Sequence, residues 1–272
     1  MSVETSPLTD DDIAFIHNTL ERMRHADPKL RVYLAKAHKY KVGLPIPEED
    51  LSRFEKKTGI TLPADWRSFL ARVGPGAGPK SGVEYHIAEK DLEMYDLQNP
   101  FPYTEATGPF DDWEEEVSRY PHGKLPGAIC IGYLGGDVFG YLVVNGPTSG
   151  TVWAYSDETY WPSGITFWQW YSRWLTFLND VAVPQLQRDA PFDQVLVGMT
   201  LTEVIRICEQ SGITLRETYR DGNEYTLSME GYISDINMTS SSSGKQEKEN
   251  KVKRIVRFGI SNKAGDFGIP GI

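Results

Sequence analysis

Cysteine is scarce in this 272-residue chain, which holds only Cys130 and Cys208. They lie far apart and neither belongs to a C-x-x-C pair, which argues against a disulfide framework and against a thiolate zinc site. We expect both to be small, buried, apolar residues.

Long apolar runs are also missing. No stretch reaches the roughly 18 apolar residues that a membrane-spanning helix needs. The first residues, MSVETSPLTDDD, have neither the basic start nor the apolar stretch of a signal peptide. The sequence therefore predicts a cytoplasmic protein that does not insert into a membrane.

Catalytic motifs are absent as well. The sequence contains no G-x-S-x-G, no H-E-x-x-H and no H-x-E with P-C-x-x-C. The glycine-rich GPGAGPK at 74–80 follows a predicted helix and places proline before its lysine, which is unlike a phosphate loop. We expect no catalytic residues, cofactor or metal, and therefore no enzyme. A hydrolase of unrecognised type is an alternative that ranks behind the two binding functions given at the end of this section.

Basic residues are almost missing from one segment. Residues 84–117 hold eleven Asp or Glu and a single basic residue, Lys90, while the rest of the chain has 27 basic and 27 acidic residues. The overall charge of −10 argues against nucleic acid as a ligand. The segment would steer a basic partner by its field. A solvated, solubilising face is the alternative.

We expect the partner-binding residues to lie in this acidic segment. A tryptophan flanked by five acids would be an aromatic anchor within a charged ring, or else a buried helix residue. The candidate partner-binding residues are Glu89, Asp91, Glu93, Asp96, Asp111, Asp112, Trp113, Glu114, Glu115 and Glu116.

The first 73 residues read as four helices. A T-x-x-D capping pattern begins a helix over 9–24, and a second amphipathic piece covers 29–39. Proline and acids begin a third helix at 47, which ends at Gly59, and the fourth covers 64–73. We expect residues 1–44 to form a helical extension.

Strands follow from Ala128. AICIGYL, VFGYLVV and GTVWAYS alternate with glycine-rich turns and predict a three-stranded antiparallel meander. ITFWQWYSRWLTFLNDV at 165–181 carries an aromatic stripe typical of a buried helix. The tryptophans of this region could form a stacking platform for bases or sugars, but their helix and strand positions favour packing in the core. They are Trp153, Trp161, Trp168, Trp170 and Trp174.

A small α+β unit is expected over 190–272, after a linker between Pro184 and Pro191. Thr200 and Glu203 form a capping box for its helix. Strands should flank the Asp221-Gly222 turn and cover about 252–260, with a polar loop, TSSSSGKQEKENK, before the last strand.

Two of these motifs resemble a known family. LSRFEKKTGITLPADWRSFL, followed by GPG, looks like the opening of the SUKH superfamily, which includes fungal cell-wall-assembly regulators. IGYLGGDVFGYLVVNGPTSGTVWAYS and TFWQWYSRWL are similar to its central strands and closing helix. The resemblance covers about 46–181, and we place a SUKH-like domain at 45–183. It implies an α+β fold with a mixed or antiparallel sheet flanked by helices.

The resemblance implies binding rather than catalysis. Many bacterial SUKH proteins are immunity proteins that neutralise a cognate toxin, often a nuclease, and eukaryotic members are interaction hubs in wall synthesis. Our leading hypothesis is an immunity protein that binds a cognate toxin with a basic active-site surface. The alternative is an interaction scaffold in envelope assembly or signalling, without a toxin.

Overall fold

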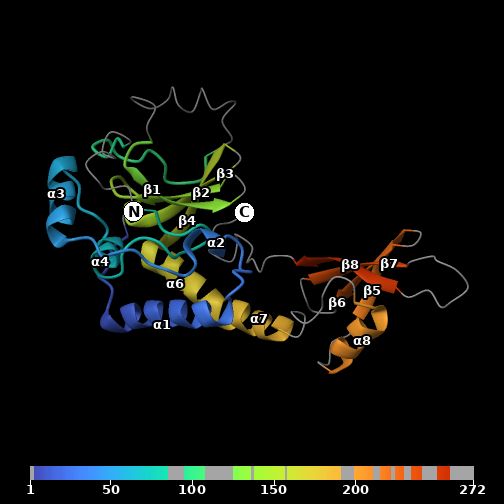
Figure 1. The fold of residues 1–272 in the computed structure, drawn as a ribbon. Helices are drawn as coiled ribbons and strands as arrows, with labels where there is room; N and C mark the ends of the chain where they lie inside the picture. The colour runs from blue at the N-terminus through green and yellow to red at the C-terminus, as the bar shows by residue number, and fades with distance from the viewer. Residues whose placement is uncertain are drawn as a thin grey trace, which may run out of the picture. The chain divides into compact units, whose positions relative to one another are not determined.

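A computed structural model describes the chain at residues 3–84, 95–107, 125–135, 138–156, 158–190, 199–210, 215–221, 224–229, 234–240 and 250–257. The chain divides into two compact units, one with the residues up to Asn179 and one that begins at Asp180. Figure 1 labels their helices and strands. No helix in the described ranges has the length and apolar character needed to cross a membrane. The domain boundaries expected from the sequence stay predictions.

Helix α1 covers Asp10–Ala26 and begins at the predicted capping box of Thr9 and Asp12. The N-terminal residues before it are fixed to the rest of the first unit. The Thr5 hydroxyl accepts the Ala64 N–H at 2.7 Å, and the Val3 N–H donates to the Ser149 carbonyl at 3.0 Å.

Helix α2 is shorter than predicted and covers only Ala35–His38. The buried Asp27 carboxylate accepts the backbone N–H groups of Arg31, at 2.7 Å, and Val32, at 3.0 Å. These bonds satisfy the backbone outside a helix, and Leu34 has a left-handed φ of 61°. The predicted helix over 29–39 is therefore wrong in its first half.

Helices α3, Glu48–Thr58, and α4, Ala64–Arg72, confirm the two predicted in the first motif. Gly59 ends α3 with a φ of 70°, a conformation in which glycine is the least strained residue. Trp66 and Phe69 of α4 are fully buried, so this helix contributes directly to the core.

A four-stranded antiparallel sheet forms the centre of the first unit, with its strands in chain order. They are β1, Ala128–Gly135; β2, Val138–Val143; β3, Thr151–Ser156; and β4, Thr159–Thr166. The first three confirm the predicted meander. The sequence did not predict β4, because Pro162 and Gly164 interrupt its pattern. Pro162 is tolerated because β4 is an edge strand.

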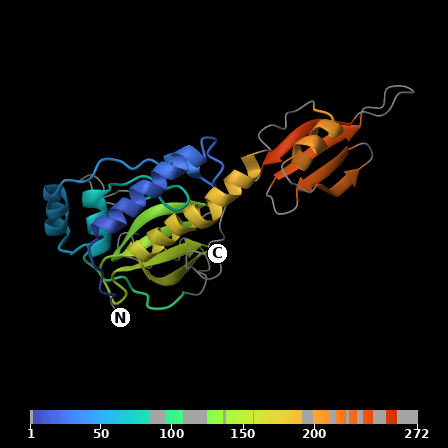
Figure 2. The same ribbon diagram turned by 90° about the horizontal axis from the view of Figure 1, so that it is seen from below.

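Helix α6, Phe167–Phe177, covers one face of this sheet and lies next to α1 (Figure 2). Ile129, Leu142 and Val152 are cross-strand neighbours and are fully buried. The α+β architecture expected from the sequence is confirmed.

Two further helical segments follow α6 along the chain, η3 over Leu178–Ala182 and α7 over Val183–Asp189. The predicted linker that begins at Pro184 is therefore helical to Asp189. Pro184 lies in the first turn of α7, where its missing N–H removes no hydrogen bond within that helix.

The second unit contains α8, Leu201–Gln210, and an antiparallel sheet of β5, Leu215–Asp221; β6, Glu224–Met229; β7, Ser234–Ser240; and β8, Asn250–Arg257. The capping box of Thr200 and Glu203 is confirmed, and so are the strands on both sides of the Asp221-Gly222 turn. β7 was not predicted, because SDINMTS is mostly polar. The register places Leu227, Ile236 and Ile255 in one row of the sheet.

Candidate interaction surface

A segment without regular structure, residues 95–107, crosses the face of the first sheet that bears Trp153. We call it the crossing segment. Near its start the Asp96 carbonyl accepts the Gly127 N–H at 2.8 Å, just before β1. At its end, Thr107 exchanges two 3.0 Å hydrogen bonds with Tyr160 of β4. The crossing segment is thus fixed at both sides of the sheet.

Aromatic side chains hold the crossing segment against the strands. Phe101 is fully buried, and its ring centroid lies 4.9 Å from that of Trp153. Tyr103 stacks on Tyr160 at 5.5 Å. This cluster also includes Ala128 and Val143. One half of this sheet face is therefore core.

A row of four aromatic residues, one from each strand, extends from this core across the rest of the face. Tyr133, Phe139, Tyr155 and Tyr160 are successive cross-strand neighbours, and we call them the aromatic row. Tyr160 is buried, Tyr133 and Tyr155 are partly exposed, and Phe139 is 37% exposed. The ring centroids are 5.5 Å apart for Tyr133 and Phe139, and 4.8 Å for Tyr155 and Tyr160.

Sequence reasoning did not find the aromatic row as a surface. Three of the strands were predicted from the sequence. The row also requires β4 and the strand register, which the turns and bulges fix. Trp153, Trp170 and Trp174 are buried, as predicted for core residues, whereas Trp161 and Trp168 are partly exposed.

Three exposed acidic residues belong to the segments that border this face. The Glu84 N–H donates to the Ile131 carbonyl at 2.9 Å, which places residue 84 beside β1. The pKa of the nearby Cys130 thiol is raised to about 11, mainly by burial and to a smaller extent by the charge of Glu84. Glu105 in the crossing segment and Glu158 in the turn before β4 are exposed.

Of the candidate partner-binding residues, only Asp96 belongs to the described residues. Its carboxylate accepts hydrogen bonds from the Asn99 side-chain amide at 3.0 and 2.9 Å, an interaction within the crossing segment. Residues outside the described ranges are Glu89, Asp91, Glu93, Asp111, Asp112, Trp113, Glu114, Glu115 and Glu116. The chain enters and leaves these stretches at Glu84, Tyr95, Thr107 and Leu125.

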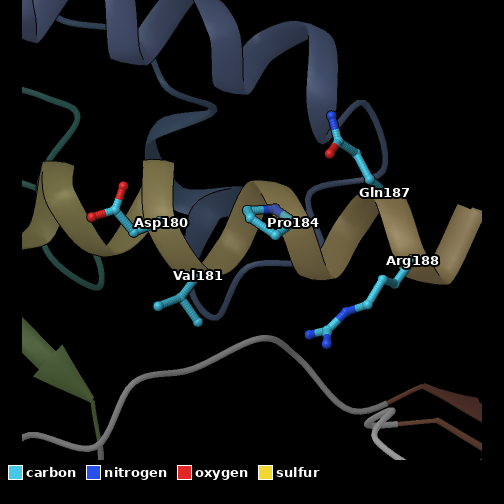
Figure 3. Close-up of a pocket in the computed structure, with 5 residues that line it drawn as sticks. All are labelled: Asp180, Val181, Pro184, Gln187 and Arg188. Carbon is cyan, nitrogen blue, oxygen red and sulfur yellow. The ribbon is translucent and has the colours of Figure 1, made fainter.

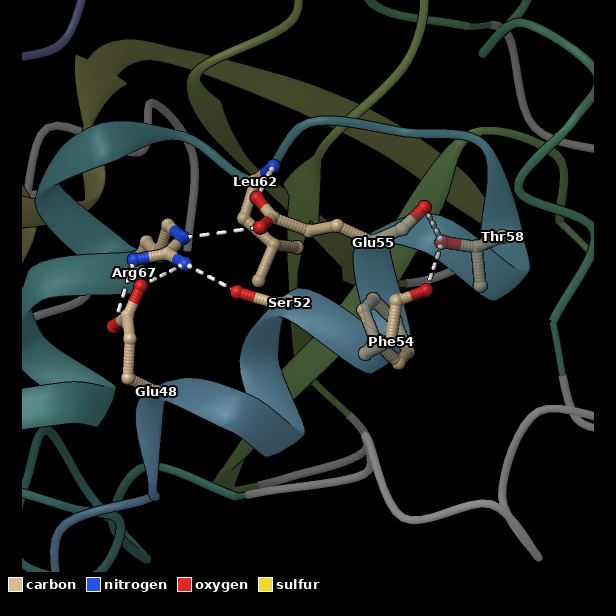
Figure 4. A network of polar contacts seen from close by, with 7 residues as sticks. All are labelled: Glu48, Ser52, Phe54, Glu55, Thr58, Leu62 and Arg67. Atoms are coloured by element: carbon tan, nitrogen blue, oxygen red, sulfur yellow. Dashed lines mark hydrogen bonds and ion pairs between the residues drawn. The ribbon is translucent and has the colours of Figure 1, made fainter.

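The first family motif has a structural role. Glu55 of α3 accepts the Leu62 N–H at 2.9 Å and the Arg67 Nε–H at 3.1 Å (Figure 4). Arg67 of α4 also pairs with Glu48. This network fixes the angle between the two helices.

Asp65 links the same motif to α6. Its carboxylate accepts the Trp66 N–H at 2.8 Å and the Trp168 N–H at 2.9 Å, although Thr166 already caps α6 in a capping box with Gln169. Burial raises the pKa of Asp65, and the backbone hydrogen bonds act in the opposite direction. Asp65 is therefore a buried structural acid.

The GPGAGPK loop lies directly against residues 41–44. A Cβ atom on Gly76 would meet the Lys41 carbonyl at 2.6 Å, and one on Gly74 would meet the Leu44 carbonyl at 2.7 Å. Both glycines have positive φ angles. The glycines of this loop thus permit close backbone packing.

His38 is partly buried next to this loop. Its Nδ1 accepts the Tyr40 N–H at 3.0 Å, and its ring makes edge contacts with Tyr40 and Trp174. Burial lowers the pKa of His38 to about 4, so the imidazole is neutral at pH 7.

A pocket of about 570 Å³ is lined by Asp180, Val181, Pro184, Gln187 and Arg188. Figure 3 shows that these residues project from successive turns of one helical stretch. They include no group of convergent titratable side chains. Across the described part of the chain, no three His, Cys, Asp or Glu residues are grouped so that they could hold a metal ion.

Both cysteines are free, and burial raises the pKa of the Cys208 thiol to about 11 as well. Cys208 is buried as predicted, whereas Cys130 is partly exposed on the sheet. Both thiols are protonated at neutral pH and are therefore poor nucleophiles.

The first unit is thus an α+β domain with helices on one face of an antiparallel sheet and a partly exposed aromatic row on the other. Residues 45–177 match the model of the SMI1 / KNR4 family (SUKH-1). This stretch of the chain belongs to that family, and the expected SUKH relationship is confirmed. Neither a curated protein nor a solved structure gave a match.

Proposed function

We propose that this chain is an immunity protein that binds a cognate bacterial toxin in the cytoplasm and neutralises it by stoichiometric association, without catalysis. The observation that carries the proposal is the concentration of negative charge within a SUKH-1 domain. Residues 84–117 hold eleven acids against one lysine. The family resemblance suggests that the partner is a toxin, and the acidic charge suggests that the contact surface of this toxin is basic.

A nuclease is the toxin class that fits this charge best. A nuclease presents a basic groove to its own substrate, and an acidic protein surface can occupy that groove. The two acidic stretches join described residues beside the aromatic face, at Glu84 and Thr107. Aromatic residues within a charged ring are typical of interface hot spots.

The pairing is tested by co-purification with the product of the adjacent gene, followed by stopped-flow association at several salt concentrations. Reversing Asp111, Asp112, Glu114, Glu115 and Glu116 to lysine should slow association about tenfold or more and flatten its salt dependence. A control variant reverses five other acidic residues: Glu4, Asp11, Glu49, Asp180 and Glu209.

Equal association rates and salt slopes for the two reversed variants would show that the acidic run is not the contact surface. A scaffold without a toxin makes a different prediction. Cells that lack this gene would then stay viable beside an intact neighbouring gene, whereas an immunity protein is needed for survival.

A further inference from the structure

The sheet face opposite α6 carries exposed aromatic rings, and the sequence around its strands is rich in acidic residues. Between Ser81 and Ser172 the sequence holds fourteen acidic residues and three basic ones, Lys90, Arg119 and Lys124. None of these three belongs to the described residues. The described basic residues at its two ends are Lys80 and Arg173, and the Lys80 ammonium lies 5.0 Å from the centre of the Tyr33 ring.

The aromatic row is only half covered. The crossing segment packs Phe101 and Tyr103 over Trp153 and Tyr160, and the fully buried residues of this face lie beneath it. At the other end of the row Phe139 is 37% exposed, and Tyr133 and Tyr155 are partly exposed. Three adjacent strands therefore carry aromatic rings that are partly accessible to a partner.

Two acidic residues lie at the margins of the sheet that carries this row. The Glu84 N–H donates to the Ile131 carbonyl and holds Glu84 on the outer side of β1, so that β1 lies between Glu84 and the strand of Phe139. Glu158 lies in the turn between β3 and β4, next to the Ser156–Thr159 pair and one pair beyond Tyr155 and Tyr160. Both glutamates are exposed.

We propose that the aromatic row, with Glu84 and Glu158 at its margins, binds an arginine-bearing cationic segment of the protein partner. The proposal rests on the proposed function and names the chemistry of the contact. A guanidinium stacks its plane on an aromatic ring while its N–H groups donate to nearby carboxylates. Lysine has no planar group to stack, and nucleic acid is repelled by the surrounding charge.

Binding of labelled peptides to the full chain tests the chemistry without the natural partner. The probes are (Gly-Arg)6, (Gly-Lys)6 and (Gly-citrulline)6, measured by fluorescence anisotropy. Citrulline keeps the shape and planarity of arginine and removes its charge. The arginine peptide should bind most tightly, the lysine peptide more weakly and the citrulline peptide least.

Two leucine variants remove a ring and keep an apolar side chain. Phe139→Leu and Tyr155→Leu should each weaken binding of the arginine peptide about threefold. The matched control is Phe15→Leu on α1, because Phe15 is also 37% exposed. Urea unfolding of each variant checks that the fold is retained.

Two results would overturn the proposal: citrulline binding equal to arginine binding, or equal affinities for Phe139→Leu and Phe15→Leu. The product of the adjacent gene separates this proposal from the proposed function. If that product does not bind but the arginine peptide does, the immunity function fails and the surface stands. If it binds the wild type and Phe139→Leu equally, the surface is wrong and the immunity function stands.

Discussion

The carboxylate of Asp65, at the start of α4, accepts the backbone N–H of Trp168 at the start of α6 at a distance of 2.9 Å. A side chain in the first family motif thus supports the N-terminus of the closing helix. The L-P-x-D pattern has a physical reason, because the acid satisfies an N–H group that the helix itself leaves without an acceptor.

Asp65→Asn should lower the free energy of unfolding by about 1–3 kcal/mol, because an amide nitrogen then faces one of the two backbone donors. Urea unfolding followed by tryptophan fluorescence measures it. The control Asp50→Asn changes an exposed acid that pairs with Arg53 on α3 and should stay within about 0.5 kcal/mol. Equal effects of the two substitutions would refute this role of Asp65.

The lowered pKa of His38 predicts that the free energy of unfolding falls in acid. Its pKa is about 4 in the folded protein and about 6.5 when unfolded, so the unfolded state binds more protons between these values. The His38 contribution to stability is therefore complete above pH 6.5 and falls as the pH falls towards 4. Between pH 7 and pH 5 the loss should be about 2 kcal/mol.

His38→Asn keeps an acceptor for the Tyr40 N–H and removes the titration, so the pH dependence of unfolding should become shallower by this amount. His25→Asn is the control, because the His25 side chain is 79% exposed. Urea unfolding of the wild type and both variants at pH 7 and pH 5 provides the comparison. An unchanged slope for His38→Asn would contradict the assignment.

Glu55 should matter more than Glu48, although both pair with Arg67. The Glu55 side chain is 19% exposed and also accepts the Leu62 N–H. Glu55→Ala should therefore destabilise the fold by about 1–2 kcal/mol. Glu48→Ala removes an exposed partner and should have a clearly smaller effect in the same thermal or urea unfolding experiment.

Gly132 and Gly140 are cross-strand neighbours that should respond differently to alanine. A Cβ atom on Gly132 would lie 2.5 Å from the Gly82 carbonyl, whereas the nearest atom to one on Gly140 is 3.5 Å away. Gly132→Ala should cost about 1–3 kcal/mol and displace residues 81–84 from β1. Amide hydrogen exchange should then show reduced protection of Glu84, and Gly140→Ala should leave that protection unchanged.

Local signals allowed most of the helices to be predicted. The capping boxes at Thr9 and Thr200 and the glycine that ends α3 act within one or two turns, so the sequence near them is sufficient. The helix predicted at 29–39 failed for a non-local reason, since the fold buries Asp27 and directs its carboxylate to the following backbone.

The sheet was only partly predictable. The three apolar strands have a clear alternating pattern, whereas β4 contains proline and glycine and is stabilised by pairing with β3 and by Thr107. The aromatic row requires all four strands in their final register. The predicted acidic contact residues, apart from Asp96, lie outside the described residues and stay predictions.

The division of the chain between Asn179 and Asp180 allows the two units to be followed by different spectroscopic signals. All seven tryptophans precede Asp180, and Trp66, Trp153 and Trp170 are fully buried. Indole emission therefore reports melting of the SUKH-1 domain alone. Far-ultraviolet circular dichroism follows both units, and a difference between the two melting curves would measure how independently the second unit unfolds.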